Sequence, residues 1–174
     1  RQFLDINKFI GGMDIDAKHT GQRTTGDRIA IRRGYETGRF LYAGGGLKLM
    51  PIIDYRAYAD FKNGDNHQRF HSFSTRARLQ AANGYIENHI MLTESDKYGL
   101  FSLESPQLLS ALENMEQWLT NLNPIRISDR TREILEKARP ADLVDACFTK
   151  DDLKISERQT YLGETKCNQL YPRQ

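Results

Sequence analysis

The sequence predicts an α/β protein, because strand-like and helix-like segments alternate between residues 49 and 122. A strand–helix–strand–helix order implies parallel pairing and layered α/β architecture. The 174 residues include 13 Gly, 5 Pro and 2 Cys, so the chain suffices for one domain with a hydrophobic core, or for part of a larger one. One such unit cannot cover both faces of a sheet, so we expect another segment or chain to complete it.

Residues 1–48 are expected to form a helical and loop lead-in. Residues 1–10 have a short helical spacing of apolar side chains, and residues 13–26 are polar and rich in Gly and Thr, which indicates a loop. Asp27 can cap a helix that runs from residue 28 to about residue 37, with Gly38 at its end.

Residues 49–122 contain the four elements that define the fold class. The apolar run Met50–Tyr55 predicts a strand, with Pro51 near its start. The next helix is expected to begin at Asp65, because Asp65 and Gln68 have the spacing of a capping box, and to end at Asn83-Gly84.

The run His89–Thr93 predicts a second, buried strand, and Ser105-Pro106 opens a helix that extends to Leu122. Residues 123–174 are expected to contain only a short helix and an irregular tail. Ser128 can cap that helix, which must end before Pro140.

Charge and hydropathy exclude several classes of protein. The chain carries 25 Lys and Arg against 23 Asp and Glu, with both signs mixed, so nothing favours nucleic-acid binding. No apolar run approaches the roughly 20 residues that span a bilayer. The mean hydropathy of −0.66 is low for a self-contained domain, and the chain opens at Arg1 without a leader. We therefore expect a fragment or a processed chain that packs against another segment and does not fold alone.

Asp60 is the first candidate site residue. It follows the first predicted strand, and the carboxyl ends of parallel strands are where open α/β sheets place their sites. The alternative is an ordinary turn Asp. Asp54 lies inside the same strand, where a charge needs a partner, so we expect a structural pairing with Arg56 or Arg76.

His67 and His71 are the second candidates, and three interpretations stay open. Four residues apart on one predicted helix, they would share a face. In the first turn, the helix dipole would lower the pKa of His67 and favour the neutral imidazole of a general base. With Asp60 and Asp65 the pair could instead hold a metal ion, although the third ligand and the Glu base of such sites are not evident. Both could also lie on a solvated face.

No Ser lies in a G-x-S-x-G context, so a hydrolase would need its nucleophile from outside these residues. Cys147 and Cys167 are 20 residues apart in the tail. A disulfide there would contribute about 3 kcal/mol by loop entropy and would favour an oxidising compartment; two reduced thiols are the alternative.

From Leu49 to Thr93 the pattern resembles the C-terminal half of an α/β-hydrolase, in which a strand, an acid, a helix and the last strand follow one another; Asp60 matches the acid. Over nearly its full length the chain resembles the C-terminal part of a family of large, uncharacterised bacterial α/β-hydrolase-like proteins. The segments that carry this resemblance are Phe3–Asn7, Ile10–Asp16, Gly64–His67, Arg76–Leu79, Arg139–Cys147 and Cys167–Pro172.

The resemblance implies the C-terminal portion of an α/β-hydrolase-type sheet, and one departure matters. Such enzymes place the triad His just after the last strand, yet residues 93–105 contain no His, and His89 lies at the other end of its strand. We therefore assign the acid to Asp60 and the base to His67, with His71 second.

The leading hypothesis is an ester or acyl hydrolase without a cofactor. Its Ser nucleophile would come from the remainder of the same polypeptide or from a cleaved partner chain, and the protein would be periplasmic or extracellular. The alternatives are a non-catalytic α/β module that binds a ligand or partner, and a metal-assisted hydrolase.

Overall fold

The computed structural model describes residues 28–60, 66–100 and 102–173. The chain divides into two compact units, residues 1–42 and 43–174. In the first unit, α2 (Arg28–Glu36) confirms the predicted helix. Gly34 is required there, because a Cβ atom at this position would lie 2.5 Å from the Phe40 ring. The helix and loop expected within residues 1–26 lie outside the described residues.

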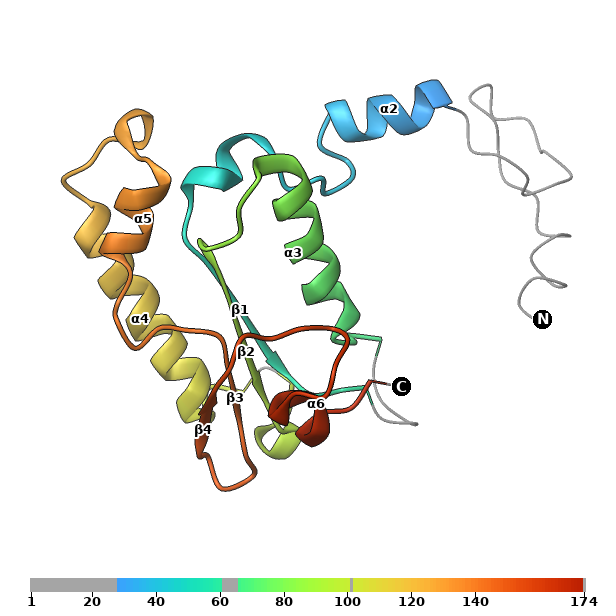
Figure 1. Ribbon diagram of the computed structural model, residues 1–174, viewed down its shortest axis with the longest axis vertical. Coiled ribbons are helices and arrows are strands. Elements are labelled where there is room, and N and C mark those ends of the chain that lie inside the picture. The colour runs from blue at the N-terminus through green and yellow to red at the C-terminus, as the bar shows by residue number, and fades with distance from the viewer. Residues whose placement is uncertain (1–27, 61–65, 101, 174) are drawn as a thin grey trace, which may run out of the picture. The chain divides into compact units, whose positions relative to one another are not determined.

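The second unit contains a four-stranded mixed sheet in the order β1-β2-β3-β4 (Figure 1). The strands are β1 (Ile52–Ala57), β2 (His89–Glu94), β3 (Ala146–Phe148) and β4 (Lys154–Ser156). β1 pairs with β2 in parallel, Ile52 opposite His89, and β3 is also parallel to β2, whereas β4 is antiparallel. The α/β class and the parallel pairing are therefore confirmed, as is the partial hydrolase-like sheet.

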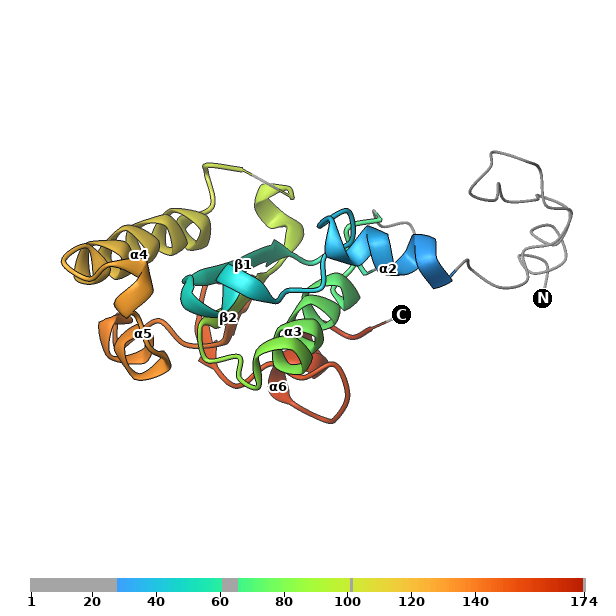
Figure 2. The ribbon, with the colours of Figure 1, turned by 90° about the horizontal axis from the view of Figure 1, so that it is seen from above.

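Helices cover both faces of this sheet (Figure 2). α3 (Phe70–Asn83) connects β1 to β2 on one face, and α4 (Pro106–Leu122) and α5 (Arg132–Ala138) connect β2 to β3 on the other. α6 (Lys166–Leu170) follows β4. Short 3₁₀ turns, η1 (Gly45–Leu49), η2 (Asp96–Tyr98) and η3 (Ile127–Asp129), occupy the connections. No helix among the described residues has both the length and the apolar character needed to cross a membrane.

The ends of α4 are as predicted, but two other helix starts are not. The Ser105 hydroxyl accepts the amide hydrogen of Leu108 at 3.0 Å and caps α4. α3 begins at Phe70 rather than at residue 65. Ser128 lies inside η3, where its hydroxyl donates to Asp129, so Thr131 caps α5 instead.

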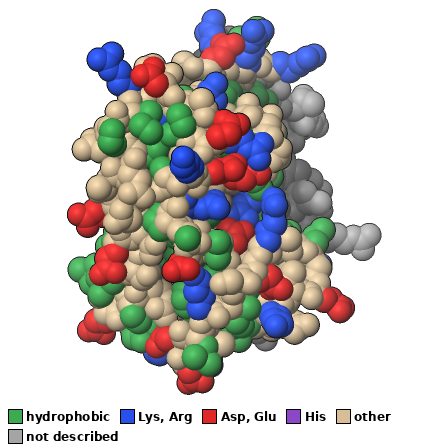
Figure 3. Space-filling model, turned by 60° about the vertical axis from the view of Figure 1, so that its left-hand side comes forward, with side chains coloured by type: hydrophobic (Ala, Val, Ile, Leu, Met, Phe, Trp, Pro, Cys, Tyr) green, Lys and Arg blue, Asp and Glu red, His purple; other side chains and the backbone are tan. Residues whose placement is uncertain are grey.

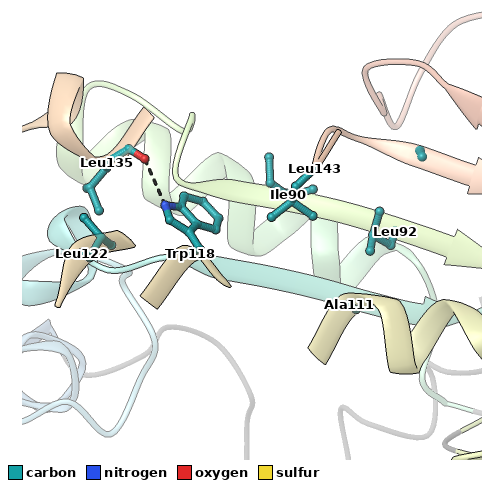
Figure 4. Close-up of a cluster of buried hydrophobic side chains, with 8 residues drawn as sticks. Ile90, Leu92, Ala111, Trp118, Leu122, Leu135 and Leu143 are labelled. Carbon is teal, nitrogen blue, oxygen red and sulfur yellow. Dashed lines mark hydrogen bonds between the residues drawn. The ribbon is translucent and has the colours of Figure 1, made fainter. Parts of the chain in front are cut away.

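The hydrophobic core lies between the sheet and the helices α4 and α5 (Figure 4). Trp118 is fully buried, and its indole N–H donates to the Leu135 carbonyl at 3.0 Å, which joins α4 to α5. Ile90 and Leu92 of β2 point into this cluster, whereas the alternate residues of the strand face α3. The apolar stripe of α4 therefore forms the core on one face only.

The tail is more ordered than its composition suggests. It supplies β3, β4 and α6, although it was expected to be irregular after the short helix. Cys147 and Cys167 form a disulfide with a Cα–Cα distance of 5.7 Å, which confirms the predicted pair. Both half-cystines are buried with Tyr171 in a second small core on the α3 side of the sheet, so the disulfide compensates for the few apolar residues available.

Candidate active site at the carboxyl edge of the sheet

Asp60 lies just past β1, at the edge where the sequence places it. Its side chain is buried, and Oδ1 accepts the backbone amide hydrogen of Arg69 at 2.7 Å. Arg69 directly precedes α3, so Asp60 satisfies a backbone donor at the start of this helix. This contact explains why the helix begins later than the capping box predicts. Residues 61–65, Asp65 among them, lie outside the described residues.

The C-terminal tail holds Arg69 in place from the other side. Arg69 is 3% exposed, and its guanidinium donates to the Tyr171 carbonyl and, at 3.1 Å, to Oδ1 of Asn168. Burial lowers the pKa of Arg69, which the negative charge of Asp60 opposes. The disulfide at Cys167 fixes the helix that carries Asn168. The tail therefore supports the backbone group that binds Asp60.

His67 lies before α3, not in its first turn, so the helix-dipole argument does not apply to it. Its side chain is exposed, and its carbonyl accepts a hydrogen bond of 2.5 Å from the Arg56 guanidinium. Because Arg56 belongs to β1, this bond holds the His67 backbone beside the carboxyl end of that strand. His67 also lines a cavity of about 60 Å³ together with Tyr55, Arg56, Ala57 and Leu100.

His71 lies in the first turn of α3 and is exposed, with its ring 3.9 Å from the Phe70 ring centre. Since His67 is outside the helix, the expectation that the two His share a helix face is wrong. Within residues 28–60, 66–100 and 102–173, no group of three or more His, Cys, Asp or Glu side chains is arranged to hold a metal ion.

Glu94 is a buried carboxylate at this edge that sequence reasoning missed. It ends β2, is 2% exposed, and accepts a hydrogen bond from the Tyr55 hydroxyl through Oε1. Burial and the Glu94 contact raise the pKa of Tyr55. Burial also raises the pKa of Tyr171 to about 12, and the charge of Glu94 acts in the same direction. The sequence signal for Glu94 was its place at the end of an apolar run, but the predicted strand ended one residue earlier, at Thr93.

At the opposite, amino edge of the parallel strands, a polar network holds the sheet to α3. Arg76 donates to both carboxylate oxygens of Asp145, at 2.5 and 2.8 Å, and its Nε donates to Nδ1 of His89 at 3.1 Å. A neutral His89 therefore carries its proton on Nε2, which lies 3.5 Å from Asp54.

Asp54 is structural, as predicted, but its partners differ from those expected. The Ser72 hydroxyl donates to Asp54 at 2.9 Å, whereas Arg56 donates to Ser72 and Arg76 pairs with Asp145. Burial acts to raise the pKa of Asp54, but His89 and Ser72 lower it, and the net pKa lies below its usual value.

A larger hollow of about 300 Å³ also lies at this amino edge. It is lined by charged residues of both signs, Arg76, Glu87, Arg139, Asp145, Glu157 and Arg158, together with His89, Ser156 and apolar side chains. Figure 3 shows the same mixture of signs over the face that carries α4 and α5. The hollow is thus separate from Asp60 and has no dominant charge.

Comparison with known proteins gives one match. The profile of a family described as a tannase-like family of unknown function (DUF6351) matches residues 1–174. No curated protein and no solved structure matches the chain.

Proposed function

Because the chain belongs to this tannase-like family of unknown function, we propose that it supplies the acid and the base of an α/β-type ester or acyl hydrolase. Asp60 orients the imidazole of His67 and stabilises its protonated form, and His67 takes the proton from a Ser of another segment or chain. The enzyme needs no cofactor.

The observation that carries the proposal is the anchoring of both residues at the carboxyl end of β1. The Arg69 amide fixes Oδ1 of Asp60, and the Arg56 guanidinium fixes the His67 carbonyl. Oδ2 of Asp60 is then the oxygen assigned to the imidazole. A triad further requires that the acid hold the imidazole in one tautomer and one orientation, and this role is the one assigned to Oδ2.

Turnover of an activated ester by the native protein tests the assignment. His67→Ala should abolish turnover, and Asp60→Asn should lower it by about 10⁴-fold. Asn keeps a carbonyl oxygen for the Arg69 amide, so this variant should stay folded. His71→Ala is the matched control, since His71 is a neighbouring exposed His, and it should cost far less. If His71→Ala alone abolished turnover, the base would be His71; full activity in all three variants would reject the assignment and favour a non-catalytic module.

We also propose a periplasmic or extracellular location. The Cys147–Cys167 disulfide supports this, because structural disulfides persist in oxidising compartments. The protein is purified in its native form, denatured without reductant and titrated for thiols; neither cysteine should react. Two free thiols would remove the support.

A further inference from the structure

The outermost strands of the sheet are β1 and β4, and the longer of them, β1, lacks an outer neighbour among the described residues. It pairs with β2 alone. The Ile52 amide donates to the Asn88 carbonyl at 2.8 Å, and the Tyr58 amide donates to the Glu94 carbonyl at 2.8 Å. The even-numbered residues of β1 therefore direct their backbone groups toward β2.

Backbone groups alternate in direction along a strand, so Ile53, Tyr55 and Ala57 direct their N–H and C=O groups away from β2. No backbone partner for these groups lies in the described part of the chain, so the three residues present a row of donors and acceptors that fits one further strand.

Both faces of β1 are covered, as in an interior strand, but five of its six residues are only half-buried, in contrast to the fully buried β2. Ile53 and Tyr55 pack against the core cluster under α4, and Asp54 is bonded to Ser72 of α3 on the other face. Parallel strands covered on both faces are typical of the inside of a sheet. β1 has no Pro or bulge within Ile52–Ala57, and its two charged side chains are bonded within the fold, Asp54 to Ser72 and Arg56 to Ser72 and the His67 carbonyl.

An apolar flank of α4 lies on the same side. Leu112 and Leu119 are 53% and 43% exposed, and with Met115 they line a hollow of about 460 Å³. On α4, Asn121 donates to the Ala138 carbonyl of α5, and Leu119 lies about 160° away around the helix axis. The flank thus faces away from α5. α4 contacts β1, and in Figure 2 α5 lies on the side of α4 that is nearer to β2, so a flank that faces away from α5 is on the side of the unpaired edge.

We propose that the outer edge of β1 and the Leu112–Leu119 flank of α4 together bind a parallel β-strand and its following helix from the α/β segment that carries the nucleophile. This rests on the proposed function, because a parallel neighbour would bring its own carboxyl end beside Asp60, where a hydrolase needs its nucleophile. The strand binds through the backbone groups of Ile53, Tyr55 and Ala57, and the helix covers the leucines of α4.

Hydrogen exchange at single-residue resolution in the native protein tests the strand. The amides of Asp54 and Arg56, which face β2, are the internal controls. The amides of Ile53, Tyr55 and Ala57 should be protected to the same degree. Exchange of these three amides at least 100-fold faster than the controls would show an open edge and overturn the proposal.

Photo-crosslinking identifies the occupant. A photoreactive phenylalanine at Leu119 should crosslink to a peptide from outside residues 1–174, and a crosslink to residues 1–27 would overturn the proposal. One at Leu162, which is 63% exposed in a loop, is the control. Leu112→Asp with Leu119→Asp should abolish protection of the three outward amides, whereas Leu162→Asp should not. Crosslinks between two copies of this chain, detected by isotope mixing, would overturn the proposal in favour of a homodimer.

Fluorophosphonate labelling of the same sample separates this proposal from the proposed function. A protected edge with a crosslinked α/β segment but no labelled Ser would sustain the docking surface and reject the hydrolase. A labelled Ser together with an open edge would sustain the hydrolase and reject the docking surface.

Discussion

Removing the Cys147–Cys167 disulfide should both destabilise the protein and loosen the support of Asp60. The change is the double variant Cys147→Ala/Cys167→Ala. Because both sites are buried, Ala is chosen so that no lone thiol remains and no polar atom is introduced. The disulfide closes a loop with a sequence separation of 20. Chain entropy for a loop of this size predicts a loss of about 3 kcal/mol in the free energy of unfolding. For a domain of this length, that loss lowers Tm by about 6–12 °C.

The local effect follows from the position of α6. Asn168 and Tyr171 follow Cys167 closely in sequence, and both accept hydrogen bonds from the Arg69 guanidinium. Without the disulfide these acceptors move more freely, so the Arg69 amide should lose protection beyond the global loss.

Denaturant unfolding followed by circular dichroism measures the global effect, and amide exchange measures the local one. Thr131→Ala, which removes the cap of α5, is the matched control because it should cost about 1 kcal/mol far from the tail. In this control, protection of the Arg69 amide should fall only as much as the global stability. A loss below 1 kcal/mol in the double variant, or an Arg69 amide that behaves as in the control, would refute the reasoning.

Three further predictions concern the sheet and α3. Arg76→Met should lower the free energy of unfolding by about 3–5 kcal/mol, because it leaves the Asp145 carboxylate without its cation. Arg126→Met, at an exposed position before η3, is the control and should change stability by less than about 0.5 kcal/mol. Equal effects in denaturant unfolding would contradict this. The lowered pKa of Asp54 contributes stability that is present above the ordinary pKa of 3.8 and is lost as the pH falls through the pKa of the folded state. Asp54→Asn should therefore flatten the pH dependence of the free energy of unfolding below about pH 4. An unchanged pH profile would refute the pairing. Gly84→Ala should lower the free energy of unfolding by about 1 kcal/mol, measured by denaturant unfolding, because φ at Gly84 is +77° although an added Cβ would meet no atom within 4 Å. A substitution without effect on stability would contradict this.

The strand–helix–strand–helix order and the parallel pairing were predictable because they depend on strong local signals. Long apolar runs and a Ser-Pro cap specify β2 and the start of α4 with little help from tertiary contacts. The later start of α3 was not predictable, since it depends on a bond between Asp60 and Arg69 that the local sequence does not encode. The three-residue strands β3 and β4 are too short for a periodicity to be detected.

Part of the candidate site was predictable for the same reason. Asp60 follows a recognisable strand, so its place at the carboxyl edge follows from the fold class. The roles of Glu94 and Arg69 depend on partners 39 and 102 residues away, which a single sequence does not reveal. His89 is similar: its pairing with Asp54 follows from strand register rather than from spacing.

Peptide mapping of the native protein after fluorophosphonate labelling tests the central claim most directly. The account predicts one modified Ser outside the Ser residues of this chain, with labelling lost in His67→Ala and kept in His71→Ala. A protein that stays unlabelled while folded, or one that labels equally in His67→Ala, would contradict the claim that Asp60 and His67 serve a hydrolase site at this edge of the sheet.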